Sequence, residues 1–285
     1  MADQPNAGMS EFWNGSGGEN WVSREARLES SLRPFGQQAI AAGAIVAGQQ
    51  ILDIGFGCGD TTLEMAVKAG PEGQVHGVDI STAMVETAEN KAAGKGVANV
   101  SFECADAQTK AFPVDNYDLV FSRFGVMFFD DPIAAFKNIY TALKPGGRLA
   151  FMCWAPRDQN AWVGLPLQVV AKHLSLPAPP AIDEPGPFSL SEESRVSAIL
   201  GAAGFTDIAV ELFQTPFVLG GDVDEAVSFL MQLSPSGGAI NNAEADEPTR
   251  ARIAIEMAEM LKSHESDKGV SMSAAALLVT ACKQD

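Results

Sequence analysis

Histidine, cysteine and positive charge are all scarce in this sequence of 285 residues. It contains three histidines and four cysteines, and 19 basic residues stand against 36 acidic ones. The net charge of −17 repels phosphate backbones and anionic lipid, so we expect neither nucleic acid nor a membrane surface as a partner. The cysteines form no Cys-x-x-Cys pair, which favours reduced thiols of a cytoplasmic protein over a metal site or a disulfide framework.

Long apolar runs are missing as well. No stretch of 18 or more apolar residues occurs, so we expect no segment that spans a bilayer. The first residues, Met1 to Asn6, carry neither a basic nor an apolar region, so we expect no secretory signal. The chain has the length of one large domain or two small ones, and it can bury a substantial core.

The stretch from Ile51 to Leu63 organises the rest of the chain. A short apolar run ends in three glycines at alternate positions, and polar residues typical of a helix start follow at once. This pattern predicts a buried strand, a tight loop and a helix N-terminus, where we expect Thr61 and Glu64 to form a capping box. Glycine leaves no Cβ between the main chain and a ligand, and a helix N-terminus attracts anionic or nucleotide-like groups. A plain turn is the alternative interpretation.

The spacing of these glycines separates two kinds of nucleotide site. A dinucleotide fingerprint, G-x-G-x-x-G, requires its third glycine at the position of Asp60, whereas the third glycine of this chain is Gly59. A second acidic landmark, Asp79, ends an apolar run that begins at Val75 and predicts the next strand. A carboxylate at the end of that strand is suited to accept hydrogen bonds from both hydroxyls of a ribose.

The motifs between Ile51 and Trp154 resemble the class I S-adenosylmethionine-dependent methyltransferases, particularly the small-molecule group that includes the ubiquinone- and menaquinone-biosynthesis methyltransferases. The matching pieces keep the order and the spacing of that family, whereas residues 1–35 and 155–285 resemble it only in general layout. The pieces are Asp53-x-Gly55-x-Gly57-x-Gly59, Val78-Asp79-Ile80-Ser81, Cys104-Ala105-Asp106-Ala107, Tyr117-Asp118-Leu119-Val120-Phe121-Ser122 and Leu143-Lys144-Pro145-Gly146-Gly147-Arg148-Leu149.

The resemblance implies an α/β fold with a seven-stranded, mostly parallel, Rossmann-like sheet that carries helices on both faces. It implies S-adenosyl-L-methionine as the cofactor and S-adenosyl-L-homocysteine as its product. It assigns Asp106 to the adenine amino group and the Ala107 backbone N–H to the ring, because adenine's edge offers a donor beside an acceptor. A helix cap or a turn is the alternative role of Asp106. The cofactor-binding residues that the matching motifs imply are Asp53, Gly55, Gly57, Gly59, Asp79, Ile80, Asp106, Ala107, Ser122 and Arg123.

Three segments fall outside the sheet pattern. We expect an N-terminal helical cap over residues 1–48 and the cofactor-binding domain over 49–285, with helical insertions at about 155–190 and 217–268. The first twenty residues are polar and glycine-rich, and we expect them to be mobile without ligand. The last two strands are predicted over 208–213 and 276–282.

N-terminal helices cover the cofactor in this family, which implies that Trp21 and Arg27 close over its methionine end. Arg27 would then pair with the methionine carboxylate. Ordinary packing of the tryptophan and a solvated arginine are the alternative interpretation. The cap and the two insertions are the expected walls of a substrate chamber at the carboxyl ends of the strands.

The segment after the fourth predicted strand is unusually apolar for a loop. The resemblance puts this strand tip near the methyl group, so Ser122 and Arg123 would touch the methionine part of the cofactor. Met127, Phe128 and Phe129 would then line a substrate pocket, with burial in the core as the alternative. Asp131-Pro132 next predicts the start of a helix, with the aspartate as N-cap and the proline at the first helical position.

The reaction that the resemblance implies is an SN2 displacement at the sulfonium methyl group, in which the protein aligns the reactants and excludes water. An oxygen nucleophile needs a base, and the only histidines are His76, His173 and His264. His76 lies in a strand and is interpreted as structural. His173 is the better candidate for a base, with a solvated helix residue as the alternative. No catalytic residue is assigned, and no metal site is expected.

The leading hypothesis is a monomeric or homodimeric enzyme that methylates an oxygen, nitrogen or carbon nucleophile of a small molecule. A methyltransferase fold that uses the cofactor for another reaction, such as intramolecular attack on its own carbon chain, is the alternative, because cofactor motifs do not report which bond breaks. Asp60 disfavours a nicotinamide-dependent oxidoreductase or a non-catalytic nucleotide binder. A base-flipping methyltransferase would need an Asn/Asp-Pro-Pro-Tyr/Phe motif, and Asp131-Pro132-Ile133 lacks the aromatic residue.

Overall fold

The computed structural model describes residues 5–284, and its centre is a single eight-stranded sheet. The strand order is β3-β2-β1-β4-β5-β8-β6, and β7 pairs with β8 beside this path. β1 to β5 pair in parallel, and β8 lies antiparallel between β5 and β6. The expected α/β fold with a mostly parallel sheet is confirmed, and the short β7 adds to it. The bounds are β1 (Gln50–Ile54), β2 (Gln74–Asp79), β3 (Val100–Cys104), β4 (Tyr117–Arg123), β5 (Leu143–Trp154), β6 (Thr206–Gly220), β7 (Glu265–Ser266) and β8 (Gly269–Cys282).

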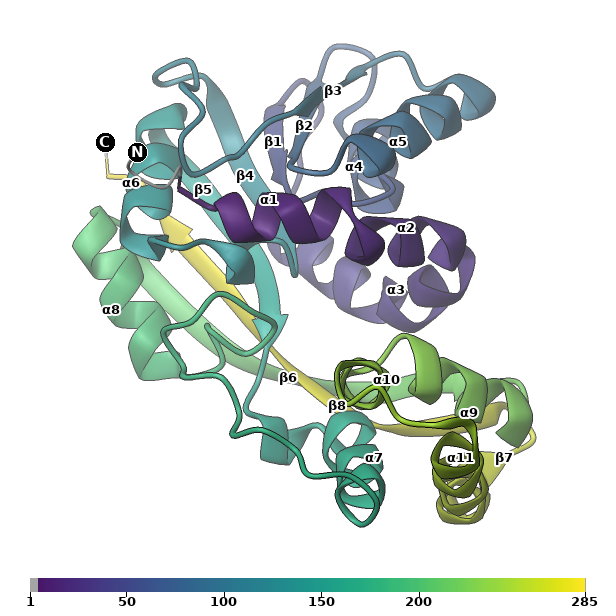
Figure 1. Ribbon diagram of the computed structural model, residues 1–285. Coiled ribbons are helices and arrows are strands. Elements are labelled where there is room, and N and C mark those ends of the chain that lie inside the picture. The colour runs from purple at the N-terminus through teal and green to yellow at the C-terminus, as the bar shows by residue number, and fades with distance from the viewer. Residues whose placement is uncertain (1–4, 285) are drawn as a thin grey trace.

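Helices cover both faces of the sheet (Figure 1). On one side of the sheet, α4 and α5 contact β2 and β3, and α3 contacts β4, β5, β6 and β8. On the other side, α6 and α8 pack against each other, α6 contacts β5 and α8 contacts β6. The helices are α1 (Ala7–Asn14), α2 (Ser16–Ser23), α3 (Glu25–Ala42), α4 (Asp60–Ala69), α5 (Thr82–Lys95), α6 (Pro132–Ala142), α7 (Ala161–Ala171), α8 (Glu193–Ala203), α9 (Val223–Gln232), α10 (Pro235–Asn242) and α11 (Glu247–Leu261), with single turns η1 (Val126–Phe128), η2 (Arg157–Gln159) and η3 (Lys262–His264).

The two central strands, β1 and β4, are apolar on both faces because helices cover the sheet from either side. Leu52 in β1 and Phe121 in β4 are fully buried, as the apolar runs of the sequence predict. The predicted start of α6 is also confirmed. Asp131 is its N-cap and accepts a hydrogen bond from the Ala134 backbone N–H at 2.9 Å, with Pro132 in the first turn.

The last two long strands extend far beyond their predicted bounds. β6 runs to Gly220 and β8 begins at Gly269, and the two pair along most of their length. β6 has polar residues at many positions and contains Pro216, and the sequence pattern predicts a strand only over residues 208–213. In the path β6 pairs only with β8, so it is an edge strand, where a proline costs no ladder hydrogen bond on the free side.

The extended ends of β6 and β8 carry a group of helices outside the sheet, α9 to α11, with α7 packed against them. α9, α10 and α11 all lie within the helical insertion expected at about 217–268. Of the three, α10 is the least evident from sequence, because Pro-Ser-Gly-Gly at its start is typical of a loop. A side-chain N-cap stabilises α10: the Ser234 hydroxyl is buried and accepts a hydrogen bond from the Ser236 backbone N–H at 3.1 Å.

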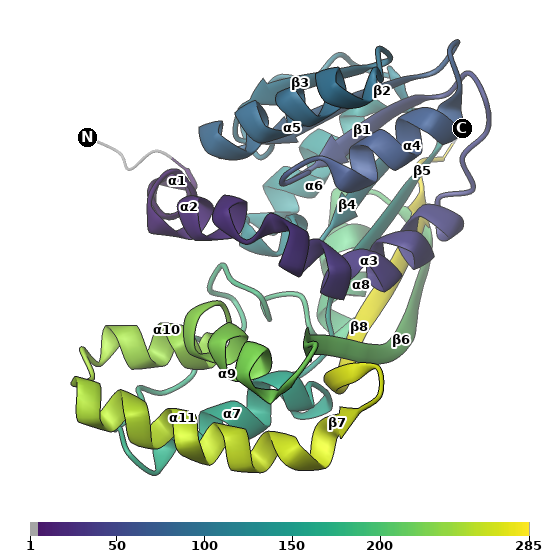
Figure 2. The ribbon, with the colours of Figure 1, turned by 90° about the vertical axis from the view of Figure 1, so that its right-hand side faces the viewer.

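The N-terminal segment forms three successive helices. In Figures 1 and 2, α1 to α3 lie between the body formed by the sheet with α4 and α5 and the group formed by α7, α9, α10 and α11. The residues expected to be mobile without ligand thus form α1 and α2 from Ala7 onward. Within residues 5–284, no helix combines the length and the apolar character needed to cross a membrane.

Candidate functional site

The glycine loop joins β1 to α4 at the carboxyl end of the sheet, and its three glycines have different neighbours. Gly55, Gly57 and Gly59 have φ angles of 65°, 61° and 83°, which glycine adopts without strain. A Cβ on Gly55 would stand 2.7 Å from the Cα of Gly125, and one on Gly59 would stand 2.9 Å from the Cβ of Ala88. A Cβ on Gly57 would meet only the indole Nε1 of Trp21 at 3.6 Å. Two glycines are therefore required for packing, and Gly57 faces the side that α2 covers.

Asp79 lies at the end of β2 and holds the tip of this loop. Its carboxylate accepts a hydrogen bond from the Gly57 backbone N–H at 2.8 Å and another from the Ser81 backbone N–H at 2.9 Å. The side chain is buried, and burial raises the pKa of this carboxyl to about 6 even though backbone hydrogen bonds favour its charged form. The predicted ribose carboxylate is thus next to the glycine loop and turned toward it.

Asp53, at the end of β1, is fully buried beneath the same loop. Its Oδ2 accepts a hydrogen bond from the Thr62 hydroxyl at 2.7 Å and a longer one from the Thr61 hydroxyl at 3.5 Å. Burial raises the pKa of Asp53 to about 7. The predicted capping box at Thr61 and Glu64 is wrong, because Gly59 is the N-cap of α4 and the threonine turns inward to the buried carboxylate.

Asp106 and Ala107 follow β3, next along the sheet. The Asp106 carboxylate accepts hydrogen bonds from the Gln108 backbone N–H at 2.9 Å, the Thr109 hydroxyl at 3.1 Å and the side-chain amide of Asn6 at 2.8 Å. Ala107 is buried, and its carbonyl oxygen accepts from Asn138 at 2.9 Å. Asp106 therefore stabilises its own turn through Gln108 and Thr109, and it also accepts a hydrogen bond from the primary amide of Asn6.

The tip of β4 packs directly on the glycine loop. The Ser122 hydroxyl is buried and accepts a hydrogen bond from the Gly125 backbone N–H at 3.1 Å, which holds the turn that touches Gly55. Phe124 has a left-handed φ of 62°, rare for a bulky residue, and its ring stacks on Trp154 with centroids 4.2 Å apart. Ser122 thus positions the loop through Gly125.

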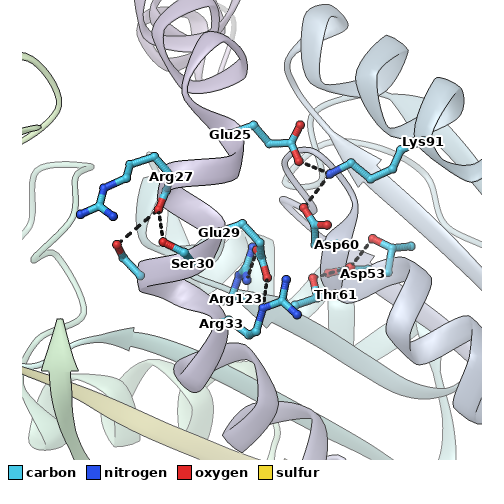
Figure 3. A network of polar contacts seen from close by, with 12 residues as sticks. Glu25, Arg27, Glu29, Ser30, Arg33, Asp53, Asp60, Thr61, Lys91 and Arg123 are labelled. Carbon is cyan, nitrogen blue, oxygen red and sulfur yellow. Dashed lines mark hydrogen bonds and ion pairs between the residues drawn. The ribbon is translucent and has the colours of Figure 1, made fainter. Parts of the chain in front are cut away.

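Arg123 enters the site from the same strand tip. Its guanidinium donates to Glu29 of α3 at 2.7 Å, and both side chains are only 11% exposed. Figure 3 shows this pair beside Thr61 and Asp53. A Cβ on Gly36 would stand 3.0 Å from the Thr61 side chain and 3.1 Å from the Arg123 side chain, so these groups are close neighbours.

Trp21 and Arg27, the two residues expected to close over the methionine end, lie in different surroundings. Trp21 lies above Gly57 and meets Trp13 edge-on, with ring centroids 5.8 Å apart. Arg27 donates to the Val218 carbonyl oxygen at 3.2 Å, beside the Phe229 ring. Its side chain points away from Asp53 and Arg123 in Figure 3. The structure brings Trp21 to the glycine loop and Arg27 to the end of β6.

The three apolar residues after β4, Met127, Phe128 and Phe129, also lie in different surroundings. Met127 and Phe129 are buried in the core, so the core interpretation holds for both. Phe128 is partly exposed and meets Trp13 edge-on, with ring centroids 5.3 Å apart. Phe128 is therefore the one of the three on the side of α1 and α2.

Two histidines make contacts outside the glycine-loop site. His76 Nδ1 lies 2.8 Å from the Tyr117 hydroxyl and its Nε2 lies 3.3 Å from Glu103, which supports the structural interpretation. His173 Nε2 lies 2.8 Å from a carboxylate oxygen of Glu256 in α11. His173 thus links the first insertion to the second.

Sequence reasoning missed an ion cluster that joins the N-terminal helices to the glycine loop. Lys91 of α5 is 14% exposed and donates to Asp60 at 2.7 Å and to Glu25 of α3. Figure 3 shows the Lys91 ammonium group joined to both carboxylates. The available signal was the charge of Asp60 directly after the third glycine, but its partners come from elements far along the chain.

Comparisons with known proteins agree with these motifs. Residues 51–147 match the family described as "Methyltransferase domain". Aklanonic acid methyltransferase DauC of Streptomyces sp. strain C5 is 37% identical over 118 residues, which cover 41% of this chain and 54% of that protein. The ubiquinone/menaquinone biosynthesis C-methyltransferase UbiE of Marinomonas sp. strain MWYL1 is also 37% identical over 118 residues, which cover 41% of this chain and 47% of UbiE. The chain thus spans about half the length of the curated relatives it matches.

A solved structure shares the fold over nearly the whole chain. The phosphoethanolamine N-methyltransferase 2 of Haemonchus contortus, in complex with phosphomonomethylethanolamine and S-adenosylhomocysteine, superposes with a TM-score of 0.52 at 22% identity. The superposition covers 93% of this chain and 53% of the other.

Proposed function

The chain belongs to the class I S-adenosylmethionine-dependent methyltransferases, and on that premise we propose that it transfers the methyl group of S-adenosylmethionine to a small-molecule acceptor. One observation supports this most. The buried Asp79 carboxylate and the N–H of Gly57 form a single hydrogen-bonded unit at the carboxyl ends of β1 and β2. In open α/β sheets this is where ligands bind, and a carboxylate there suits ribose hydroxyls.

The side chains of the site fit the cofactor. Among the residues that the structure describes, Asp53 Oδ1 and Ser81 Oγ are two of the three buried side-chain polar atoms without a hydrogen-bond partner. A buried oxygen without a hydrogen-bond partner destabilises the folded protein. The ammonium and hydroxyl groups of S-adenosylmethionine are hydrogen-bond donors that would satisfy such oxygens. We assign Asp79 to the ribose, Asp106 and the Ala107 N–H to adenine, and Asp53 and Arg123 to the methionine part.

When bound, S-adenosylmethionine supplies an electrophilic methyl group on a positive sulfur. The residues of this chain contribute orientation and the exclusion of water, which together account for much of the acceleration of such a displacement. Gly57 leaves room for the ligand. The aromatic side chains of Trp13, Trp21 and Phe128, of which Trp13 contacts the other two, are proposed to cover it. We assign no residue as a base: His76 contacts Tyr117 and Glu103, and His173 contacts Glu256, both away from the glycine loop.

The acceptor is proposed to be a small molecule because the chain has a net charge of −17, which opposes binding of nucleic acid. Helices α1 to α3 and the group α7, α9, α10 and α11 are proposed as the cap and the chamber walls. We also propose a monomer or homodimer in the cytoplasm, a reducing compartment that suits the four free cysteines.

The proposal is tested by incubation of the protein with methyl-labelled S-adenosylmethionine and a panel of small phenolic, enolic and amine acceptors. S-adenosylhomocysteine together with a labelled acceptor is the expected result. Methylthioadenosine without label transfer would indicate the non-methylating alternative. Absence of any cofactor binding in calorimetry would contradict both hypotheses.

The two buried carboxyls predict opposite pH trends for stability and for cofactor binding. Their folded pKa values, about 7 for Asp53 and about 6 for Asp79, lie above the unfolded values, so the folded protein binds more protons between pH 4 and 7. Their contribution to stability is full at low pH and is lost as pH rises through 6 to 7. Affinity for the cofactor should instead rise over this range, because the carboxylate forms accept its hydrogen bonds.

Asp53→Asn isolates this effect. We expect the variant to be more stable than the wild type at pH 8, by roughly 2–4 kcal/mol, and to keep only a smaller part of this advantage at pH 5, closer to the unfolded pKa. Its affinity for S-adenosylhomocysteine should fall at both pH values. Thermal unfolding at pH 5 to 8 and calorimetry measure the two quantities, and a variant that is less stable at pH 8 would contradict the argument.

A further inference from the structure

Asn6 binds to the Asp106 carboxylate, which the proposed function assigns to adenine. Its side-chain amide donates to Asp106 Oδ1 at 2.8 Å, and its amide oxygen accepts from the Asp130 backbone N–H at 2.7 Å. The Asn6 backbone N–H also donates to the Asp130 carboxylate. Asn6 is only 3% exposed, so the carboxamide is inserted into the protein between the loops that follow β3 and β4.

The backbone explains why an asparagine is suited to this position. Asn6 has φ 57° and ψ 17°, the left-handed conformation, at the N-cap of α1. Asparagine is among the few non-glycine residues that adopt this conformation readily. The turn directs the short side chain toward Asp106.

The carboxamide matches adenine in its hydrogen-bonding groups. The edge of adenine has an amino donor beside a ring-nitrogen acceptor, and a primary amide has an amino donor beside a carbonyl acceptor. Asn6 satisfies Asp106 with its donor and the Asp130 N–H with its acceptor. An adenine amino group that approaches Asp106 therefore meets a carboxylate that already accepts hydrogen bonds from Asn6, Gln108 and Thr109.

The other end of α1 is fixed on the neighbouring loop. The Asn14 side chain donates to the Ile80 carbonyl oxygen at 2.9 Å and accepts from the Thr82 backbone N–H at 3.0 Å. These contacts use the backbone of the loop after Asp79 and leave the Asp79 carboxylate to Gly57 and Ser81. α1 thus spans the loops after β2 and β3: its first end contacts the Asp106 side chain, and its last residue, Asn14, contacts the backbone of the loop after β2.

We propose that Asn6 is a plug that imitates adenine and competes with the cofactor for Asp106. The inference depends on the proposed function and adds regulation of the same site. Cofactor binds only to molecules in which Asn6 has left Asp106, so the apparent affinity is the intrinsic affinity reduced by the fraction of open molecules. Trp21, which lies over Gly57 from α2, is not part of the plug and stays available as a cover.

Three variants test the plug by calorimetry with S-adenosylhomocysteine. Asn6→Ala should tighten the Kd about tenfold, the effect expected when one hydrogen bond to a charged group no longer holds the closed form. Asn6→Asp should tighten it at least as much, because a new carboxylate would face Asp106 and Asp130. Asn20→Ala is the matched control, since this exposed α2 side chain accepts a hydrogen bond from Arg24 and not from Asp106 or its loop, and it should leave the Kd unchanged.

The sign of the change decides the outcome. If Asn6→Ala left the Kd unchanged or weakened it while the wild type bound, Asn6 would be a neutral residue or a part of the adenine site, and the plug would be refuted alone. If neither the wild type nor any variant bound the ligand, both the plug and the proposed function would be refuted. A tighter Kd in both Asn6 variants but not in the control supports the plug.

Hydrogen exchange gives a second readout that a purely structural role of Asn6 would not produce. On addition of S-adenosylhomocysteine to the wild type, amides of residues 6–9 should exchange faster because the plug is released. Amides of residues 16–32 should exchange more slowly, because α2 and α3 close over the ligand. Slower exchange at residues 6–9 as well would contradict the competition.

Discussion

Gly57→Val should abolish binding of S-adenosylhomocysteine while the protein stays folded. Gly57 has an open neighbourhood, because a Cβ there meets only the Trp21 indole at 3.6 Å, on the side where the cofactor is proposed to lie. The φ of 61° adds strain of about 1–3 kcal/mol for a side chain, which a protein of this size tolerates. We therefore expect at least a hundredfold loss of affinity by calorimetry, with the circular dichroism of a folded protein.

Gly55→Ala is the matched comparison in the same loop, with the opposite expectation. The added Cβ would stand 2.7 Å from the Cα of Gly125, which is backbone and cannot swing aside. Overpacking together with the left-handed φ should lower the free energy of unfolding by roughly 3–5 kcal/mol. Urea unfolding measures this loss. If Gly57→Val unfolded the protein as severely as Gly55→Ala, the glycine would serve packing and not a ligand.

Asp79→Ala should weaken binding of S-adenosylmethionine by about 2–4 kcal/mol, or about 30- to 1000-fold in Kd. The estimate counts two hydrogen bonds from ribose hydroxyls to the carboxylate at about 1–2 kcal/mol each. Loss of the carboxylate also leaves the Gly57 N–H without its partner and loosens the loop. Calorimetry at pH 8 is the measurement, because the carboxyl is ionised there.

Asp118→Ala is the control for this substitution. Asp118 also accepts from a backbone N–H, that of Gln50 at 2.8 Å, and it pairs with Lys144. Asp118 lies near the amino end of β4, whereas Asp79 lies at the carboxyl end of β2. Asp118→Ala should cost stability without changing the Kd. Equal Kd values for the Asp79 variant and the wild type would remove Asp79 from the site.

The part of the fold and site that depends on neighbours in sequence was predictable. The apolar run before Gly55, the apolar run before Asp79 and the Asp131-Pro132 start of α6 depend on neighbouring residues, and the structure has a strand or a helix at each of them. The position of Asp79 beside the glycine loop followed from parallel strands that end at one edge of the sheet. The family motifs extended this to Asp106, whose role toward adenine stays a prediction.

The features that were missed arise from residues far apart in the chain. Nothing near Asn6 in sequence indicates Asp106, which is a hundred positions away. Gly125 looks like an ordinary turn residue until β1 and β4 are adjacent and Gly55 lies against it. Thr61 appeared to be a cap because local rules consider only the backbone N–H groups that follow it, whereas the buried Asp53 carboxylate attracts its hydroxyl.

The position of β8 between β5 and β6 has a consequence for how the protein folds. Arg148 pairs with Cys282, so the β5–β8 ladder closes a loop on the order of a hundred residues, and such non-local pairing is slow compared with helix formation. Until β8 inserts, the backbone N–H and C=O groups along one edge of β5 are unpaired, and β6 has no neighbouring strand. Exposed strand edges can pair with other chains. Refolding yield should therefore fall with protein concentration, and insertion of β8 should be the step that competes with aggregation.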